Sequence, residues 1–94
     1  MDTVSRLVVI RGRVQAVGYR DAAVQSAFVN GVAGWVRNRG DGTVEALAQG
    51  SPDAVSRFVE WCRQGPPLAR VTEVTVVVVE HDGALRHFEW RPTV

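Results

Sequence analysis

The sequence has 94 residues, enough for one small domain with a single hydrophobic core, and we expect one domain over residues 1–94. A hydrophobic content of 46% excludes a disordered chain, and a formal net charge of +1 excludes the basic footprint of a general nucleic-acid-binding protein. All 11 basic residues are arginines, which excludes Schiff-base chemistry and a lysine-based phosphate site.

The chain begins with a predicted strand, a glycine-rich loop and a helix. Residues 6–11 are mostly apolar and β-branched between two arginines, which predicts a central strand. A loop follows at residues 12–18, and the helical spacing of apolar residues then predicts a helix over residues 19–30, which Gly31 ends. The apolar stripe of this helix includes Phe28, so we expect the Phe28 ring to face the core.

A loop of this kind can bind an anion. Its successive backbone N–H groups can converge on one oxyanion, and the first free N–H groups of the following helix carry the positive end of the helix dipole. Arg20, at the junction, adds a planar and permanently charged fork that matches phosphate. Glycines also mark ordinary turns, so the loop alone leaves open a plain turn followed by a solvated arginine.

The middle of the chain predicts a hairpin and a second helix. Residues 32–39 and 43–49 have strand patterns on either side of a glycine-rich turn, as in a β-hairpin. Ser51 is a typical N-cap and Pro52 a typical first helical residue, so a helix begins there. Cys62 lies on the apolar stripe of this helix, where we expect a buried core residue rather than a nucleophile.

The remainder of the chain predicts two more strands. Residues 71–80 are rich in valine, which predicts a strand, and residues 85–91 alternate aromatic with polar side chains, as in a half-exposed edge strand. We expect Trp90, His81 and His87 at the surface. The order of elements, β-α-β-β-α-β plus one strand, predicts an α+β, ferredoxin-like (split β-α-β) sandwich. Its antiparallel sheet would have four to five strands, with two helices on one face.

Two glycine-rich motifs lie in different predicted elements and are considered together. The first is Gly12-x-Val14-Gln15-x-Val17-x-Tyr19-Arg20, and the second is Gly34-Trp35-Val36-Arg37-Asn38-x-x-x-Gly42-x-Val44, followed by Gly50. These motifs, their spacing and the order of the elements resemble the acylphosphatase family over essentially the whole chain. Ala16 departs from the pattern, because the family usually has glycine there, and Gly18 stands where many members have an aromatic residue.

The resemblance implies a small, metal-free hydrolase without a cofactor that converts acyl phosphates to a carboxylate and inorganic phosphate. It implies that Arg20 and Asn38 are the catalytic residues, Arg20 by binding the phosphate and Asn38 by orienting the attacking water. It also implies a phosphate-binding cradle of backbone N–H groups, those of Gln15, Ala16, Val17, Gly18, Tyr19 and Arg20. Free phosphate or sulfate can occupy the same loop.

The chemistry of these residue types restricts the reaction. Backbone N–H groups, one arginine and one asparagine include no group that titrates near neutral pH, which excludes strong acid–base catalysis. An acyl phosphate suits such a site, because its carboxylate leaving group needs no proton. Asn38 can orient an in-line water through its carboxamide oxygen but cannot take the proton of that water, so we expect a phosphoryl oxygen of the substrate to accept it.

Other functions stay open at this point. The split β-α-β fold also hosts non-catalytic ligand-binding and nucleic-acid-binding modules, and a homologue of a carbamoyl-phosphate-binding subdomain fits the sequence equally well. The central strands at residues 7–11 and 44–49 contain no aromatic residue, which disfavours an RNA-recognition domain. Asn38 could instead stabilise the hairpin turn through Asx-type hydrogen bonds.

The expected partner is therefore a small-molecule acyl phosphate, with no nucleic acid and no membrane. No apolar run is long enough to cross a bilayer, and the single Cys62 can form no internal disulfide, so we expect a cytoplasmic protein. A monomer is the expectation for so small a domain.

Overall fold

The computed structural model describes residues 2–94. The predicted domain, residues 1–94, includes Met1, which lies outside the described residues, and that extent stays a prediction. The elements occur in the predicted order, with strand ends shifted by up to three residues. They are β1 (Val4–Arg13), α1 (Tyr19–Asn30), β2 (Ala33–Asn38), β3 (Val44–Gly50), α2 (Pro52–Gln64), β4 (Arg70–Val78) and β5 (Phe88–Arg91).

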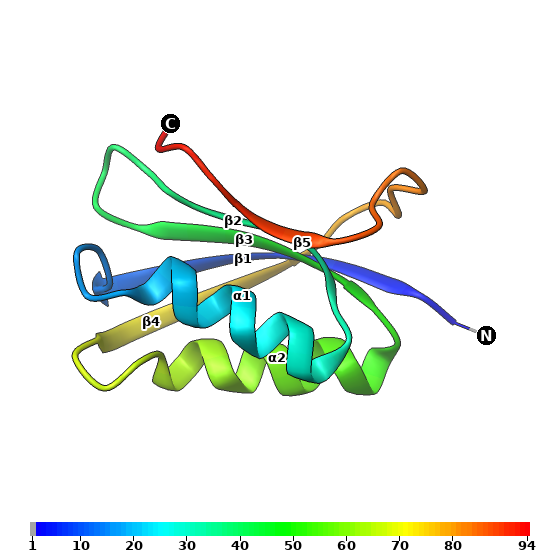
Figure 1. Ribbon diagram of the computed structural model, residues 1–94, viewed down its shortest axis with the longest axis horizontal. Helices are drawn as coiled ribbons and strands as arrows, with labels where there is room; N and C mark the ends of the chain where they lie inside the picture. Colours follow the sequence, from blue (N-terminus) through cyan, green and yellow to red (C-terminus); the bar gives the residue numbers. More distant parts are fainter. Residues whose placement is uncertain (1) are drawn as a thin grey trace.

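The five strands form one sheet, in the order β4-β1-β3-β2-β5, and both helices cover the same face of it (Figure 1). This arrangement confirms the predicted ferredoxin-like fold, with β1 and β3 as central neighbours and β2 beside β3. The prediction of an antiparallel sheet was wrong in one respect, because β5 pairs with β2 in parallel. The chain reaches β5 from β4, at the opposite edge, so no hairpin sets its direction.

The strand directions bring three strand ends together. β1 and β2 both run antiparallel to β3, and β5 runs parallel to β2, so β1, β2 and β5 all point the same way. Their carboxyl ends, Arg13, Asn38 and Arg91, therefore meet at one end of the sheet. The loop after β1 and the first turn of α1 lie at that end as well (Figure 1).

The hydrophobic core fills the space between the sheet and the two helices. α2 begins as predicted, since the Ser51 hydroxyl accepts a hydrogen bond from the backbone N–H of Ala54 at 3.2 Å. Its inner face buries Phe58 and Cys62 completely, which confirms the core position predicted for Cys62. The largest fully buried side chains are Tyr19, Phe58, Ile10, Val8, Val14, Val36, Val44 and Cys62.

The buried face of α1 differs from the predicted one. The ring of Phe28, expected in the core, is 86% exposed, so that prediction was wrong. The buried residues of this helix are instead Tyr19, Ala23, Ser26 and Ala27. Apart from Tyr19 these side chains are small. The large Tyr19 ring is buried in the core, so the side of the helix that carries it faces the sheet. Phe28 follows Ala27 by one residue, about 100° further around the helix, and so reaches solvent.

The connection between β4 and β5 crosses the other end of the sheet and is anchored by one side chain. The Gln49 carboxamide donates to the backbone oxygen of Asp82 and accepts from its N–H, both at 2.9 Å. His81 and His87 in this connection are exposed, as predicted. Among the helices in the described part of the chain, none has the length and apolar character that a membrane span requires.

Candidate active site

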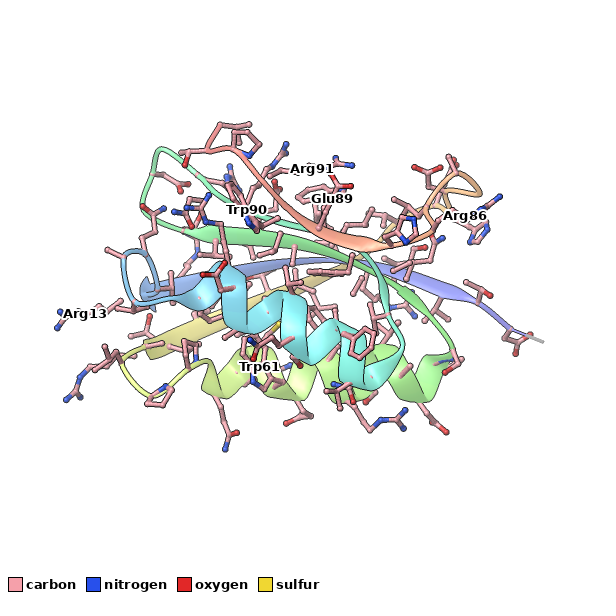
Figure 2. All side chains as sticks on the ribbon, viewed as in Figure 1. Arg13, Trp61, Arg86, Glu89, Trp90 and Arg91 are labelled. Carbon is pink, nitrogen blue, oxygen red and sulfur yellow. The ribbon has the colours of Figure 1, made fainter. Side chains whose placement is uncertain are left out.

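A pocket of about 230 Å³ opens at the carboxyl ends of β1, β2 and β5. Its lining residues come from the loop after β1, the start of α1, the end of β2 and β5: Val14, Ala16, Gly18, Tyr19, Arg20, Asp21, Asn38 and Trp90. Arg20 and Asn38, the two predicted catalytic residues, thus border the same cavity. Trp90 shares the helix-covered face of the sheet with Val36, its partner in the register, whereas Glu89 and Arg91 lie on the open face (Figure 2).

Residues 15–20, which we name the cradle loop, have the geometry of an anion site. Among residues 2–94, no hydrogen bond has a backbone N–H of the cradle loop as its donor, and the first bond of α1 runs from the N–H of Ala22 to the oxygen of Gly18 at 3.1 Å. These N–H groups are therefore available to an oxyanion beside the positive end of the helix dipole.

The backbone of the cradle loop passes through left-handed conformations. Gly18 has a φ of 79°, which glycine adopts without strain, and Ala16 has a φ of 59°. The methyl group of Ala16 makes that conformation unfavourable by about 1–2 kcal/mol. A glycine at this position would avoid the strain. The departure from the family pattern at Ala16 therefore places a strained residue in the loop and makes this conformation less stable.

The residues of the cradle loop divide between the pocket and the protein interior. Ala16, Gly18, Tyr19 and Arg20 contribute atoms to the pocket lining, while the side chains of Tyr19 and Val17 pack in or against the core. Like Val17, Gln15 does not line the pocket. The sequence predicted only a backbone role for Gln15. The participation of its side chain in building the site is therefore a finding of the structure.

Gln15 joins the cradle loop to the β2–β3 hairpin. Its Nε2 donates to the backbone oxygens of Arg39 and Thr43, at 2.8 and 2.9 Å. Arg39 directly follows Asn38, so one carboxamide fixes the loop relative to the strand end that carries Asn38. No local pattern could reveal this contact, because its partners are 24 and 28 residues away along the chain.

Replacing Gln15 by leucine should loosen the site while keeping the shape of the side chain. We expect the free energy of unfolding to fall by about 1–3 kcal/mol, since two hydrogen bonds are lost. We also expect kcat to fall by about 10- to 100-fold, because Asn38 is less well placed relative to the loop. Urea unfolding and steady-state kinetics measure the two effects. Gln25→Leu, at an exposed position of α1, is the control, and equal kcat values for both variants would contradict this role.

Arg20 is held by β5. Its Nη1 donates to the backbone oxygen of Arg91 at 3.3 Å, and its guanidinium carbon lies 4.8 Å from the centre of the Trp90 ring. Within the described residues 2–94, the Arg20 guanidinium forms no ion pair with a carboxylate. Its charge is therefore not neutralised by the protein and can attract a phosphate group.

Asn38 ends β2 on the helix-covered face of the sheet, as Val36 does two residues earlier. Its backbone oxygen accepts from the N–H of Val94 at 3.2 Å, which holds the main chain in place. In the hairpin turn the Asx-type bonds come from Asp41, whose Oδ1 accepts from the N–H and the hydroxyl of Thr43 at 3.0 and 2.6 Å. The structure thus gives that turn role to Asp41 and leaves the Asn38 carboxamide beside the pocket.

Two titratable side chains beneath the pocket, those of Tyr19 and Cys62, are neutral at physiological pH. The Tyr19 hydroxyl donates to the backbone oxygen of Cys62 at 2.7 Å, and burial raises the pKa of Tyr19 well above its usual range. Burial also raises the pKa of Cys62 to about 12, so its thiol is protonated. Tyr19 therefore anchors the start of α1, next to Arg20, and supplies no base. Over residues 2–94, no three His, Cys, Asp or Glu side chains are grouped to hold a metal ion.

Comparison with known proteins identifies the acylphosphatase family. The family model described as Acylphosphatase matches residues 6–90. An acylphosphatase of Nitrobacter hamburgensis is 58% identical over 74 residues, which are 79% of this chain and 75% of that protein. An acylphosphatase of Pyrobaculum islandicum is 46% identical and covers 100% of both chains. The crystal structure of acylphosphatase from Bacillus subtilis matches with a TM-score of 0.89 at 35% identity, over 94% of this chain and 98% of that one.

Proposed function

Because this chain belongs to the acylphosphatase family and hydrolyses acyl phosphates to a carboxylate and inorganic phosphate, we propose that the reaction takes place in the pocket beside the cradle loop. The observation that carries this proposal is that one cavity is bordered by Arg20, by Asn38 and by backbone N–H groups that have no hydrogen-bond acceptor among residues 2–94. Nothing in the comparisons or the structure favours a non-catalytic binding module or a nucleic-acid-binding module.

The phosphoryl group would bind between Arg20 and the cradle loop. The planar guanidinium can donate to two phosphoryl oxygens at once, and the loop N–H groups can bind the third. The charge on these oxygens is greatest at the transition state, so donors that are already in place lower the barrier. The helix dipole at the start of α1 adds to this stabilisation.

Asn38 would hold the attacking water. A carboxamide oxygen accepts one hydrogen bond from water and so points a lone pair of that water toward phosphorus, in line with the bond that breaks. Asn38 cannot accept the proton at neutral pH, and the neighbouring phenol and thiol of Tyr19 and Cys62 are both protonated. We propose that the proton passes to a phosphoryl oxygen of the substrate rather than to Asp21, which also lines the pocket. The phosphoryl group is then released as inorganic phosphate.

The leaving group explains why these residues suffice. When the bond between phosphorus and the bridging oxygen breaks, the electron pair stays on a carboxylate, which is stable at neutral pH without protonation. An alkyl phosphate would release a much more basic alkoxide and would require an acid or a metal ion. The pocket is therefore selective for mixed anhydrides of a carboxylic acid and phosphoric acid.

We propose that the enzyme acts as a monomer in the cytoplasm. The chain is a single small domain of 94 residues, for which a monomer is the simplest state. Cys62 is a free and buried thiol, which is compatible with a reducing compartment.

Release of phosphate in the presence of EDTA tests the proposed mechanism. We expect acetyl phosphate and benzoyl phosphate to be hydrolysed at the same rate with and without EDTA, because binding and charge stabilisation come from the chain itself. Glycerol phosphate, an alkyl ester, should release no phosphate above background. Loss of activity with EDTA that is restored by a divalent metal ion would contradict the mechanism.

A further inference from the structure

Two contacts hold the guanidinium of Arg20 in position, one with the side chain of Trp90 and one with the main chain of Arg91. The ring of Trp90 lies under the cation at 4.8 Å from its centre, and the Arg91 oxygen accepts from Nη1 at 3.3 Å. Both contacts come from β5, and neither comes from the cradle loop. The orientation of Arg20 in the pocket therefore depends on the edge strand at the far side of the site.

An indole ring is a suitable support for a cation that must bind an anion. The ring face attracts the guanidinium through its electron density and takes up none of its N–H donors. A carboxylate in the same place would use two of those donors and neutralise the charge, so an incoming phosphate would have to break an ion pair first. With Trp90 as its neighbour, Arg20 keeps most of its N–H groups available before the substrate arrives.

The position of Trp90 is fixed by the sheet. β5 pairs in parallel with β2, and the Trp90 residue lies opposite Val36, whose side chain is fully buried. The preceding Phe88 packs on Phe58 of α2 with ring centres 5.3 Å apart, which ties the strand to the core. Trp90 itself is 52% exposed and lines the pocket, so its ring is held at the rim of the site (Figure 2).

We propose that Trp90 is a positioning residue that holds the Arg20 guanidinium ready for the phosphoryl group. The inference rests on the proposed function, in which Arg20 binds phosphate. Because Trp90 acts through Arg20, its removal should weaken the binding of every phosphate-containing ligand alike, whatever the acyl group. This role was not predicted from the sequence, which gave Trp90 only a place on the surface.

The test compares Trp90→Leu with Trp90→Phe. We expect Trp90→Leu to raise the Ki of inorganic phosphate, measured as a competitive inhibitor, by about 3- to 10-fold. The KM values of acetyl phosphate and benzoyl phosphate should rise by the same factor. Trp90→Phe keeps an aromatic face and should stay within about twofold of the wild type. A purely structural role would lower thermal stability without this dependence on the ring.

Trp35 provides a matched control. It lies on the open face of the sheet, where its ring stacks on the guanidinium groups of Arg37 and Arg91 at 4.4 and 5.3 Å. Trp35→Leu therefore removes a tryptophan with two cation contacts from the neighbouring strand. We expect it to leave the Ki of phosphate unchanged.

Three results would overturn the inference. They are an unchanged Ki in Trp90→Leu, an equal loss in the phenylalanine and leucine variants, and a change in KM for benzoyl phosphate alone, which would place the ring against the acyl group. If Trp90→Leu does not fold, the wild-type NMR spectrum decides. The side-chain N–H protons of Arg20 should be shifted upfield by the indole ring, and an unshifted signal would contradict the contact. If Arg20→Ala also binds phosphate as tightly as the wild type, the proposed function fails as well.

Discussion

Replacing Arg20 by alanine lowers kcat/KM for acyl phosphates by about 10³- to 10⁵-fold, in the range that a transition-state arginine contributes in phosphoryl transfer. Arg20→Lys restores the charge but not the planar fork, and we expect it to stay at least about 10²-fold below the wild type. The Ki of inorganic phosphate should rise in both variants. Steady-state kinetics with acetyl phosphate, and with phosphate as inhibitor, give all of these values.

The control for this prediction is Arg63→Lys on α2. Arg63 is exposed, lies outside the pocket and pairs with Glu60 at 3.5 Å, so its replacement should leave kcat/KM unchanged. Full turnover in Arg20→Lys would show that a point charge is enough. Bidentate binding of the phosphoryl group would then be wrong, although the location of the site would stand.

Removal of the Asn38 carboxamide should also cause a large loss of activity. Asn38→Ala should lower kcat by about 10²- to 10³-fold, which corresponds to about 3–4 kcal/mol of transition-state stabilisation. The Ki of phosphate should change little, because the phosphoryl group binds to Arg20 and the cradle loop. Pre-steady-state and steady-state measurements with benzoyl phosphate separate the chemical step from binding.

The stability of the Asn38 variant is as informative as its rate. Asp41 supplies the side-chain hydrogen bonds of the hairpin turn. The free energy of unfolding of Asn38→Ala should therefore stay within about 1 kcal/mol of the wild-type value. Asn30→Ala, at the far end of α1, is a matched control that should keep full kcat. A large loss of stability together with activity in Asn38→Ala would identify Asn38 as a structural residue and remove it from the mechanism.

Local sequence signals predicted the parts of the fold that local interactions determine. α1 begins and ends at the predicted residues, because Gly18 and Gly31 adopt left-handed conformations at its two ends. The start of α2 was predicted from Ser51, whose hydroxyl caps the first turn of the helix. The two spaced motifs also predicted that Arg20 and Asn38 belong to one site, and in the structure both residues border one pocket.

Long-range contacts could not be predicted in the same way. The parallel pairing of β5 with β2 depends on a connection that crosses the sheet, and no turn pattern specifies it. That pairing alone brings Trp90 to the pocket and the Arg91 oxygen to Arg20. The two hydrogen bonds of the Gln15 side chain depend likewise on the packing of loop against hairpin.

The buried face of α1 shows the limit of periodicity. The hydrophobic pattern predicted a buried stripe that includes Ala27 and Phe28. The structure buries Ala27 but not Phe28, and the buried face is completed by the Tyr19 ring and by the small side chain of Ser26. Tertiary packing, rather than the apolar count of the predicted stripe, decided which face is buried.

The most direct test of the account is a titration of the protein with inorganic phosphate, followed by amide and arginine side-chain NMR signals. We expect the largest shifts at the backbone N–H groups of residues 15–20 and at the Nε of Arg20, with a smaller change at the Asn38 carboxamide. Signals on the exposed face of α1 should not move. Saturable shifts elsewhere, with the cradle loop and Arg20 unchanged, would contradict the account.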